Sequence, residues 1–114
     1  RPLTAQRSLR VEDVSGISAL MTRLRTAPPR GVAGVTVTAR DLLADTPGPR
    51  TDAVELTGRT PDRVSLRILA RPSGTEPKLK YYAEVAAAPG SATGAAELAA
   101  LLAAALDDLP ASAR

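Results

Sequence analysis

The sequence contains no cysteine and no histidine among its 114 residues. Disulfide bonds, thiolate nucleophiles and imidazole bases are therefore excluded, and so is any zinc site with nitrogen or sulfur ligands. Any chemistry performed by this chain has to use hydroxyl groups, carboxylates, arginine, lysine or backbone amides.

Large aromatic side chains are also scarce. The chain has no phenylalanine and no tryptophan, and Tyr81 and Tyr82 are its only aromatic residues. A chain of this length buries about two-thirds of its unfolded surface, which is enough for one modest core that alanine, leucine and valine have to fill. The length and the 44% of apolar residues predict a single globular domain.

Dense charge and long apolar runs are missing as well. Fifteen basic and twelve acidic residues give a net charge of +3, which suits an anionic ligand but lacks the basic runs of a nucleic-acid-binding tail. The longest apolar run, Leu98 to Leu106, is about half the length that a bilayer requires.

With no signal-like segment at the start, we expect a cytoplasmic protein without membrane or nucleic-acid partners. The chain begins at Arg1 without an initiator methionine, which indicates a piece of a longer protein.

The spacing of apolar residues predicts two helices and four strands. Residues 1–10 show no periodicity and are interpreted as a linker from a preceding domain, residues 11–110 as the domain itself, and residues 111–114 as a tail. Helical spacing predicts one helix over about 13–26, with Asp13 as its N-cap, and a second over about 93–109. The alternation typical of strands occupies residues 35–40, 53–57, 64–71 and 78–85.

The order of these elements predicts an α+β two-layer fold. Four mostly antiparallel strands that are apolar on one face are most simply covered by both helices on that face. The two clearest strands, 64–71 and 78–85, are separated by a short loop rich in proline and glycine, so we expect an antiparallel hairpin. Tyr81 and Tyr82 then point to opposite faces of one strand, one toward the core and one beside the loop.

The hairpin loop concentrates groups that an anion-binding site needs. Arg71 offers a planar fork of donors suited to bidentate contact with phosphate. Ser73 and Thr75 add hydroxyl donors, and Gly74 lets a ligand approach the backbone closely. Lys78 supplies a point charge at the start of the next strand.

The same loop also has the composition of an ordinary exposed turn, so composition leaves both interpretations open. Glu76 would repel a phosphate unless it pointed away or balanced Arg71 or Lys78. Arg67 shares a face with Arg71 and either extends the positive surface or is simply solvated. The adjacent carboxylates of residues 107 and 108 lie at a helix end without an acidic partner nearby, and we expect no metal site there.

As an ordered string, RPSGTEPK followed by LKYYAEV resembles the phosphate-binding loop and following strand of the C-terminal domain of the α-D-phosphohexomutases, the phosphoglucomutase and phosphomannomutase family. The specific match covers residues 71–78, and the looser pattern of elements extends over about 11–109. The resemblance implies a fold like that of the TATA-box-binding protein. The residues that it assigns to the substrate phosphate are Arg71, Ser73, Gly74, Thr75 and, more weakly, Lys78.

The resemblance also implies a place in a larger enzyme. Such enzymes interconvert hexose 1-phosphate and hexose 6-phosphate through a bisphosphorylated intermediate, with a phosphoserine loop, a Mg²⁺-binding aspartate loop and a sugar-recognition loop in three preceding domains. Strings resembling these loops do not occur here, so we expect a chain that holds a phosphosugar without catalysis or bound metal of its own. Residues 1–10 would then contain the hinge to the preceding domains. The sugar remains open between glucose, mannose, glucosamine and pentose phosphates, and the alternative is a stand-alone module that binds anions or nucleic acid without catalysis.

Overall fold

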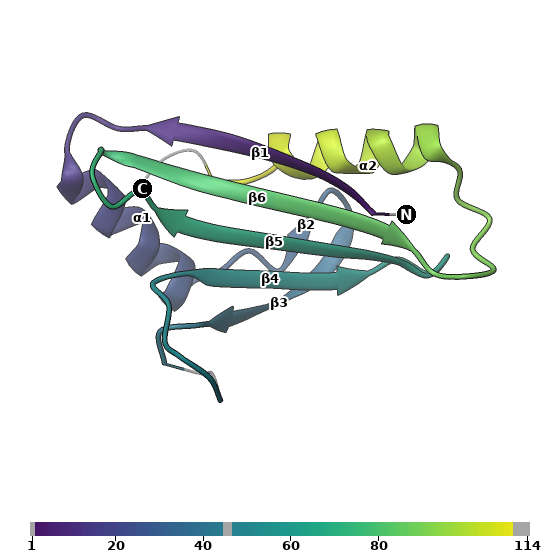
Figure 1. Cartoon of the computed structure of the whole chain (residues 1–114), viewed down its shortest axis with the longest axis horizontal. Helices are drawn as coiled ribbons and strands as arrows, with labels where there is room; N and C mark the ends of the chain where they lie inside the picture. The colour runs from purple at the N-terminus through teal and green to yellow at the C-terminus, as the bar shows by residue number, and fades with distance from the viewer. Residues whose placement is uncertain (1, 45–46, 111–114) are drawn as a thin grey trace.

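The computed structural model describes residues 2–44 and 47–110 (Figure 1). Its elements follow in the order β1 (Leu3–Arg10), α1 (Val14–Thr26), β2 (Gly31–Val32), β3 (Val35–Asp41), β4 (Val54–Arg59), β5 (Val64–Pro72), β6 (Lys78–Ala87) and α2 (Ala95–Asp107). The α+β class is confirmed, and the two expected helices and four expected strands are present close to their expected bounds. The tail expected over residues 111–114 lies outside the described residues.

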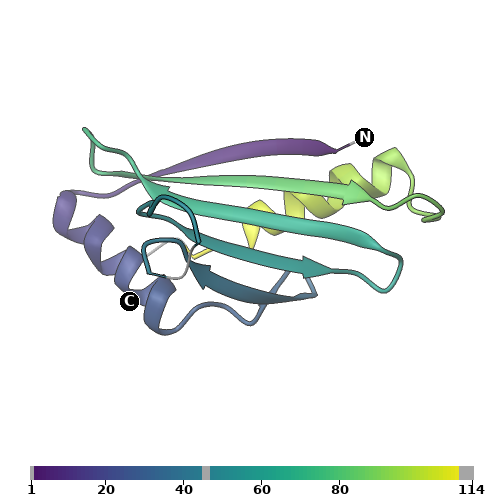
Figure 2. The ribbon, with the colours of Figure 1, turned by 60° about the horizontal axis from the view of Figure 1, so that its bottom comes forward.

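All strands belong to one antiparallel sheet with the order β1-β6-β5-β4-β3-β2. Both helices pack on the same face, with α1 at the end of the sheet that carries the β5–β6 hairpin (Figures 1 and 2). Alternate strand residues such as Ile68 and Ala83 face these helices and are buried, and Leu20 and Leu24 of α1 pack against them. In the described part of the chain, the other face of the sheet carries no helix, and it is called the open face below.

The expectation of four strands is wrong, because β1 and β2 extend the sheet to six. The linker expected over residues 1–10 is likewise wrong for Leu3–Arg10, which pairs with β6 from Leu3 opposite Val85 to Arg10 opposite Lys78. An edge strand held by a full ladder of backbone pairs is part of the domain.

Arg7 explains why β1 lacks a clear apolar alternation. It lies between Ala5 and Leu9 on the face toward the helices, where its Nη1 donates to the carbonyl of Leu106 at 2.9 Å and its Nη2 forms an ion pair with Asp107 at 2.8 Å. A cation at the carboxyl end of a helix satisfies free carbonyls and interacts favourably with the helix dipole. The polar residue that breaks the pattern is therefore a partner of α2.

Strand β2 has only two residues and forms a tight hairpin with β3. The turn uses Ala33 and Gly34, which both have positive φ angles, of 50° and 80°. Two consecutive positive φ angles are typical of the turns that match the twist of a β-hairpin. A strand this short shows no periodicity in the sequence.

The two tyrosines divide between the faces of the sheet as the alternation predicts. Tyr81 is 2% exposed in the core, and its hydroxyl donates to the carbonyl of Pro110 at 2.7 Å. Burial raises the pKa of Tyr81 to about 12. Tyr82 is half-buried on the open face.

The N-terminus of α1 is capped by the residue that the sequence predicted. The expected N-cap Asp13 is confirmed, since its carboxylate accepts from the backbone N–H of Gly16 at 3.3 Å. Among the described residues, no helix has the length and apolar character needed to cross a bilayer.

Candidate anion-binding site at the β5–β6 hairpin

The loop between β5 and β6 is closed by its own backbone. Ser73 N–H donates to the carbonyl of Lys78 at 2.8 Å, and Lys78 N–H donates to the carbonyl of Glu76 at 2.7 Å. The expected antiparallel hairpin is confirmed. A Cβ built on Gly74 would meet no atom within 4 Å, so the backbone at the tip is open to a ligand.

The end of strand β1 and the residue after it contact this loop from the side. Val11 N–H donates to the carbonyl of Pro77 at 3.0 Å, and Arg10 Nη2 lies 2.9 Å from Glu76 Oε2. Lys78 Nζ lies 3.4 Å from Glu76 Oε1. Hydrogen bonds first from Arg10 and then from Lys78 lower the pKa of Glu76. Glu76 thus balances Lys78, one of the two partners considered from the sequence, together with Arg10, which the sequence did not connect to it.

Two pairs of like charges face each other at this end of the sheet. In the register of the strands, Arg10 is opposite Lys78 and Arg71 is opposite Lys80. By the alternation of their strands, all four side chains belong to the open face. Glu76 neutralises part of the first pair, whereas within residues 2–44 and 47–110 neither member of the second pair forms an ion pair. Like charges directly opposite destabilise a sheet, and an anion placed between Arg71 and Lys80 would remove that repulsion.

The hydroxyl-bearing tip of the loop also borders a second environment. Ser73, Gly74 and Thr75 line a cavity of about 370 Å³ between the loop and α1. The opposite wall of the cavity includes Ser18, Thr22 and Arg25 of α1, and Asp52 and Glu76 border it as well.

The positive charge of Arg25 does not favour anion binding in that cavity. Its Nε lies 3.0 Å from Asp41 Oδ1 and its Nη2 lies 2.5 Å from Asp52 Oδ1, so two carboxylates neutralise its charge. Arg25 is the one cation among the described residues that line the cavity, so this side offers an anion no positive charge that is not already paired. An anion is therefore favoured on the open side of the hairpin rather than on the α1 side.

The residues that the sequence assigned to the site therefore lie in two places. Ser73, Gly74 and Thr75 lie together at the loop tip, while Arg71 and Lys78 belong to the flanking strands and do not line the α1 cavity. Sequence reasoning missed Lys80, although the hairpin register that places it opposite Arg71 follows from the two alternating strands. It also missed Arg10, because the segment containing Arg10 gave no strand signal.

The paired carboxylates at the end of α2 have structural partners. Asp107 pairs with Arg7, and Asp108 Oδ2 accepts from the backbone N–H of Ala33 at 2.8 Å. Among the described residues, no group of three or more histidine, cysteine, aspartate or glutamate side chains is arranged to hold a metal ion.

Fold and hairpin together define a two-layer α+β domain with a cationic loop at one end of its sheet. The family model described as phosphoglucomutase/phosphomannomutase, C-terminal domain, matches residues 21–105, and this chain belongs to that family. A probable phosphomannomutase of Haemophilus influenzae is 41% identical over 86 residues. The match covers 70% of this chain and 16% of that protein, so the chain spans a small part of the length of this relative.

Proposed function

We propose that this domain binds the phosphate group of a phosphosugar within a phosphohexomutase, and holds the phosphate that is not being transferred. Two findings support the proposal. One is the family match, which includes the whole hairpin. The other is the Arg71–Lys80 pair, which carries two adjacent positive charges and no ion pair to a carboxylate within residues 2–44 and 47–110. The second observation carries the proposal, because a phosphate dianion supplies the charge that this pair lacks.

The hairpin offers distinct kinds of donor to such a group. Arg71 would make bidentate contacts with two phosphate oxygens, and Lys80 would add a point charge from the neighbouring strand. Thr75 N–H now lies 3.5 Å from Ser73 Oγ, a long contact that a phosphate oxygen can replace. The space around the Cα of Gly74 is open on the side where a Cβ would stand, so a ligand can come close to the backbone there. Lys78 contributes mainly to the electrostatic potential, since its ammonium already contacts Glu76.

This chemistry fits the clamping of a phosphate rather than its transfer. The hairpin presents donors but no histidine or cysteine to act as base or nucleophile. In an enzyme that interconverts 1- and 6-phosphates, one phosphate has to be held while the other end of the sugar reacts. The phosphoserine and the Mg²⁺ of such an enzyme would belong to its other domains, and no step proposed for this chain requires a metal.

The expected affinity of the domain alone is low. Charge-assisted hydrogen bonds contribute roughly 1.5–3 kcal/mol each, and an association cost of about 4 kcal/mol or more offsets much of the sum of three. We expect dissociation constants in the millimolar range. The remaining affinity would come from the domains that close over the substrate.

An NMR titration of the ¹⁵N-labelled chain with inorganic phosphate tests this proposal. We expect millimolar saturation, with shifts concentrated at the amides of residues 73–75, and at least tenfold weaker binding by Arg71→Gln. Ser18→Ala, in the α1 cavity, is the matched control and should bind as the unmodified chain does. Equal binding by Arg71→Gln, micromolar binding, or shifts confined to the α1 residues Ser18, Thr22 and Arg25 would contradict the proposal.

A further inference from the structure

The Glu76 carboxylate has a cation at each of its two oxygens. Arg10 Nη2 lies 2.9 Å from Oε2, and Lys78 Nζ lies 3.4 Å from Oε1. Arg10 is the last residue of β1, so the shorter contact directs the carboxylate toward the edge of the sheet. The charge of Glu76 is therefore used on this side of the hairpin.

The main chain of the loop fixes where the Glu76 side chain begins. Lys78 N–H donates to the carbonyl of Glu76 at 2.7 Å, and Pro77 between them has a restricted φ angle. Val11 N–H donates to the carbonyl of Pro77 at 3.0 Å and joins the loop to the residue that follows β1. The Glu76 side chain itself is 44% exposed, so its direction depends on its ionic partners rather than on packing.

A second set of cations lies one row of side chains away. Lys80 follows Lys78 by two residues on β6, and side chains two residues apart share a face and are separated by about 6.5–7 Å along the strand. Arg71 lies opposite Lys80, and these two residues are called the cationic pair below. Without Arg10, Glu76 would keep only its longer contact, the one with Lys78. Its carboxylate could then turn toward the cationic pair.

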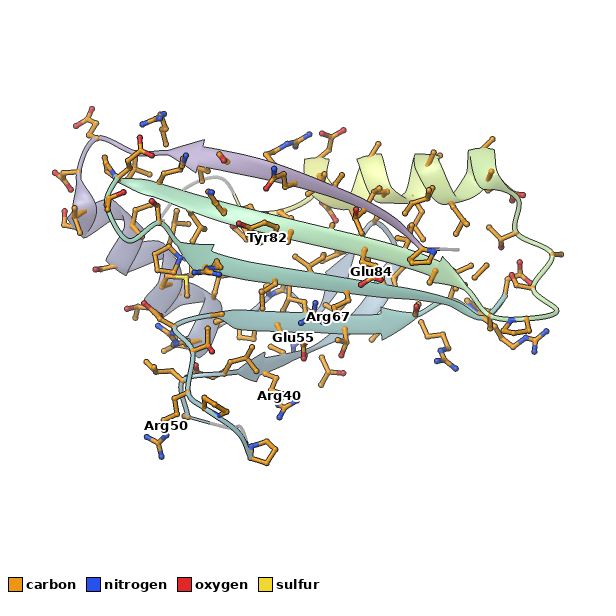
Figure 3. All side chains as sticks on the ribbon, in the orientation of Figure 1. Arg40, Arg50, Glu55, Arg67, Tyr82 and Glu84 are labelled. Carbon is orange, nitrogen blue, oxygen red and sulfur yellow. The ribbon has the colours of Figure 1, made fainter. Side chains whose placement is uncertain are left out.

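Two other carboxylates of the open face lie farther from the cationic pair. Figure 3 shows Arg67 of β5 with Glu84 and Glu55 on either side. Glu84 is directly opposite Arg67 in the register, and Glu55 Oε2 lies 2.5 Å from Arg67 Nε. This group is four residues, about 13 Å, along the strands from the cationic pair. Of these three carboxylates, Glu76 therefore competes most directly with an anion for the pair.

We propose that Arg10 is a positioning residue for the phosphate site. It holds Glu76 toward β1 and so keeps this carboxylate from occupying Arg71 and Lys80 in place of a phosphate. The inference rests on the proposed function, because it concerns access to the same cationic pair. When Arg10 is removed, Glu76 becomes an internal competitor that a phosphate has to displace before it binds.

A double-mutant cycle on phosphate affinity tests this role. NMR titrations give the dissociation constant of inorganic phosphate for the unmodified chain, Arg10→Gln, Glu76→Gln and the double variant. At about 0.15 M salt, the Debye length of about 8 Å limits the direct field of Arg10 at the cationic pair. Arg10→Gln should weaken binding about two- to fivefold, the range expected of an exposed ion pair. In the Glu76→Gln background the same substitution should have little effect, because the competing carboxylate is absent.

Further variants separate positioning from a general loss of charge or structure. Arg10→Lys keeps a cation for Glu76 and should bind phosphate nearly as the unmodified chain does. Arg59→Gln, the matched control, removes one positive charge from the end of β4 remote from the hairpin and should show no coupling to Glu76. Arg10→Gln should leave the midpoint of urea unfolding nearly unchanged, since exposed ion pairs contribute little to stability. Without ligand, it should also shift the NMR signal of the Arg71 Nε–H group.

The two proposals fail in different ways. Unchanged binding by Arg10→Gln, or equal weakening with and without Glu76, would overturn the positioning role while the phosphate site stands. Weakening that accompanies a general loss of stability and is not recovered in Arg10→Lys would assign Arg10 to the structure of the hairpin alone. An unmodified chain whose hairpin amides do not respond to phosphate would refute the proposed function, and the role of Arg10 with it.

Discussion

Arg71 and Lys80 lie directly opposite each other on β5 and β6, and neither forms an ion pair with the part of the chain that the structure describes. The neighbouring like-charge pair, Arg10 and Lys78, has Glu76 beside it. The Arg71–Lys80 pair therefore leaves an excess of positive charge next to the hairpin tip. An anion that binds there stabilises the folded chain, since it binds the native state in preference to the unfolded one.

Replacing Lys80 by glutamine should therefore change stability and binding in opposite directions. Without an anion at low salt, loss of the repulsion should raise the free energy of unfolding by about 0.2–1 kcal/mol. Phosphate affinity should fall several-fold, because one of the two attracting charges is gone. Urea unfolding with and without phosphate measures both effects, and the stability gain should shrink at high salt. Lys78→Gln is the control and should not stabilise the chain, since Lys78 already contacts Glu76. A loss of stability in Lys80→Gln would argue against the repulsion.

Two glycines offer a matched pair of alanine substitutions. A Cβ at Gly58 would collide with the backbone carbonyl oxygen of Thr36 on β3, whereas a Cβ at Gly74 would meet nothing within 4 Å. Gly58→Ala should lower the free energy of unfolding by about 1–3 kcal/mol, because the strands have to separate. Gly74→Ala should stay within about 0.5 kcal/mol of the original chain and yet weaken phosphate binding, since the methyl group narrows access to the loop amides. Denaturation and phosphate titration of both variants check this, and unchanged binding by Gly74→Ala would remove Gly74 from the site.

Tyr81 should make the domain sensitive to alkaline pH. Its pKa in the folded chain is raised to about 12, above the value of about 10 for an unperturbed tyrosine. Between these values the unfolded state loses the phenolic proton first, so stability falls as pH rises through this window. Tyr81→Phe should lose about 1 kcal/mol at neutral pH with the hydrogen bond to Pro110. The difference in stability between the two proteins should narrow from pH 9 to pH 11. Urea unfolding across this range provides the measurement, and a constant difference would show that Tyr81 does not titrate differently on unfolding.

Removal of residues 1–10 tests the assignment of β1 to the domain. The deletion exposes the edge of β6 and withdraws Leu3 and Leu9 from the core. Their combined burial accounts for about 3 kcal/mol, and the bare strand edge promotes association between chains. We expect a lower thermal midpoint and concentration-dependent aggregation, followed by circular dichroism and light scattering. Removal of residues 1–2 alone is the control. A shortened chain as stable as the original would restore the interpretation of this segment as a linker.

The strands that could be predicted from the sequence are those with an uninterrupted alternation. In β5 and β6 every second residue is apolar, and the structure buries those residues. In β1 the alternation fails at Arg7, whose partner is the carboxyl end of a helix about a hundred positions later in the chain. No local pattern contains that information, and the two residues of β2 are too few to form one.

The candidate site could be predicted in part. The order of residues 71–78 indicated both the chemistry and the family, and the family is confirmed. The role of Lys80 required the strand register, and the role of Arg10 required the correct strand. The difference between the α1 cavity, where Arg25 is paired with carboxylates, and the cationic open face required the whole fold, because Asp52 and Arg25 come from distant segments.

By itself, the sequence determined the α+β class, the hairpin, the donors at its tip and the family, because each is encoded in residues that are neighbours along the chain. Only the tertiary structure decided which of the cations near the hairpin has a carboxylate beside it and which, among the described residues, has none. The reason is that the energy of an ion pair depends on the distance between two charges, and across a sheet that distance is set by strand order and register.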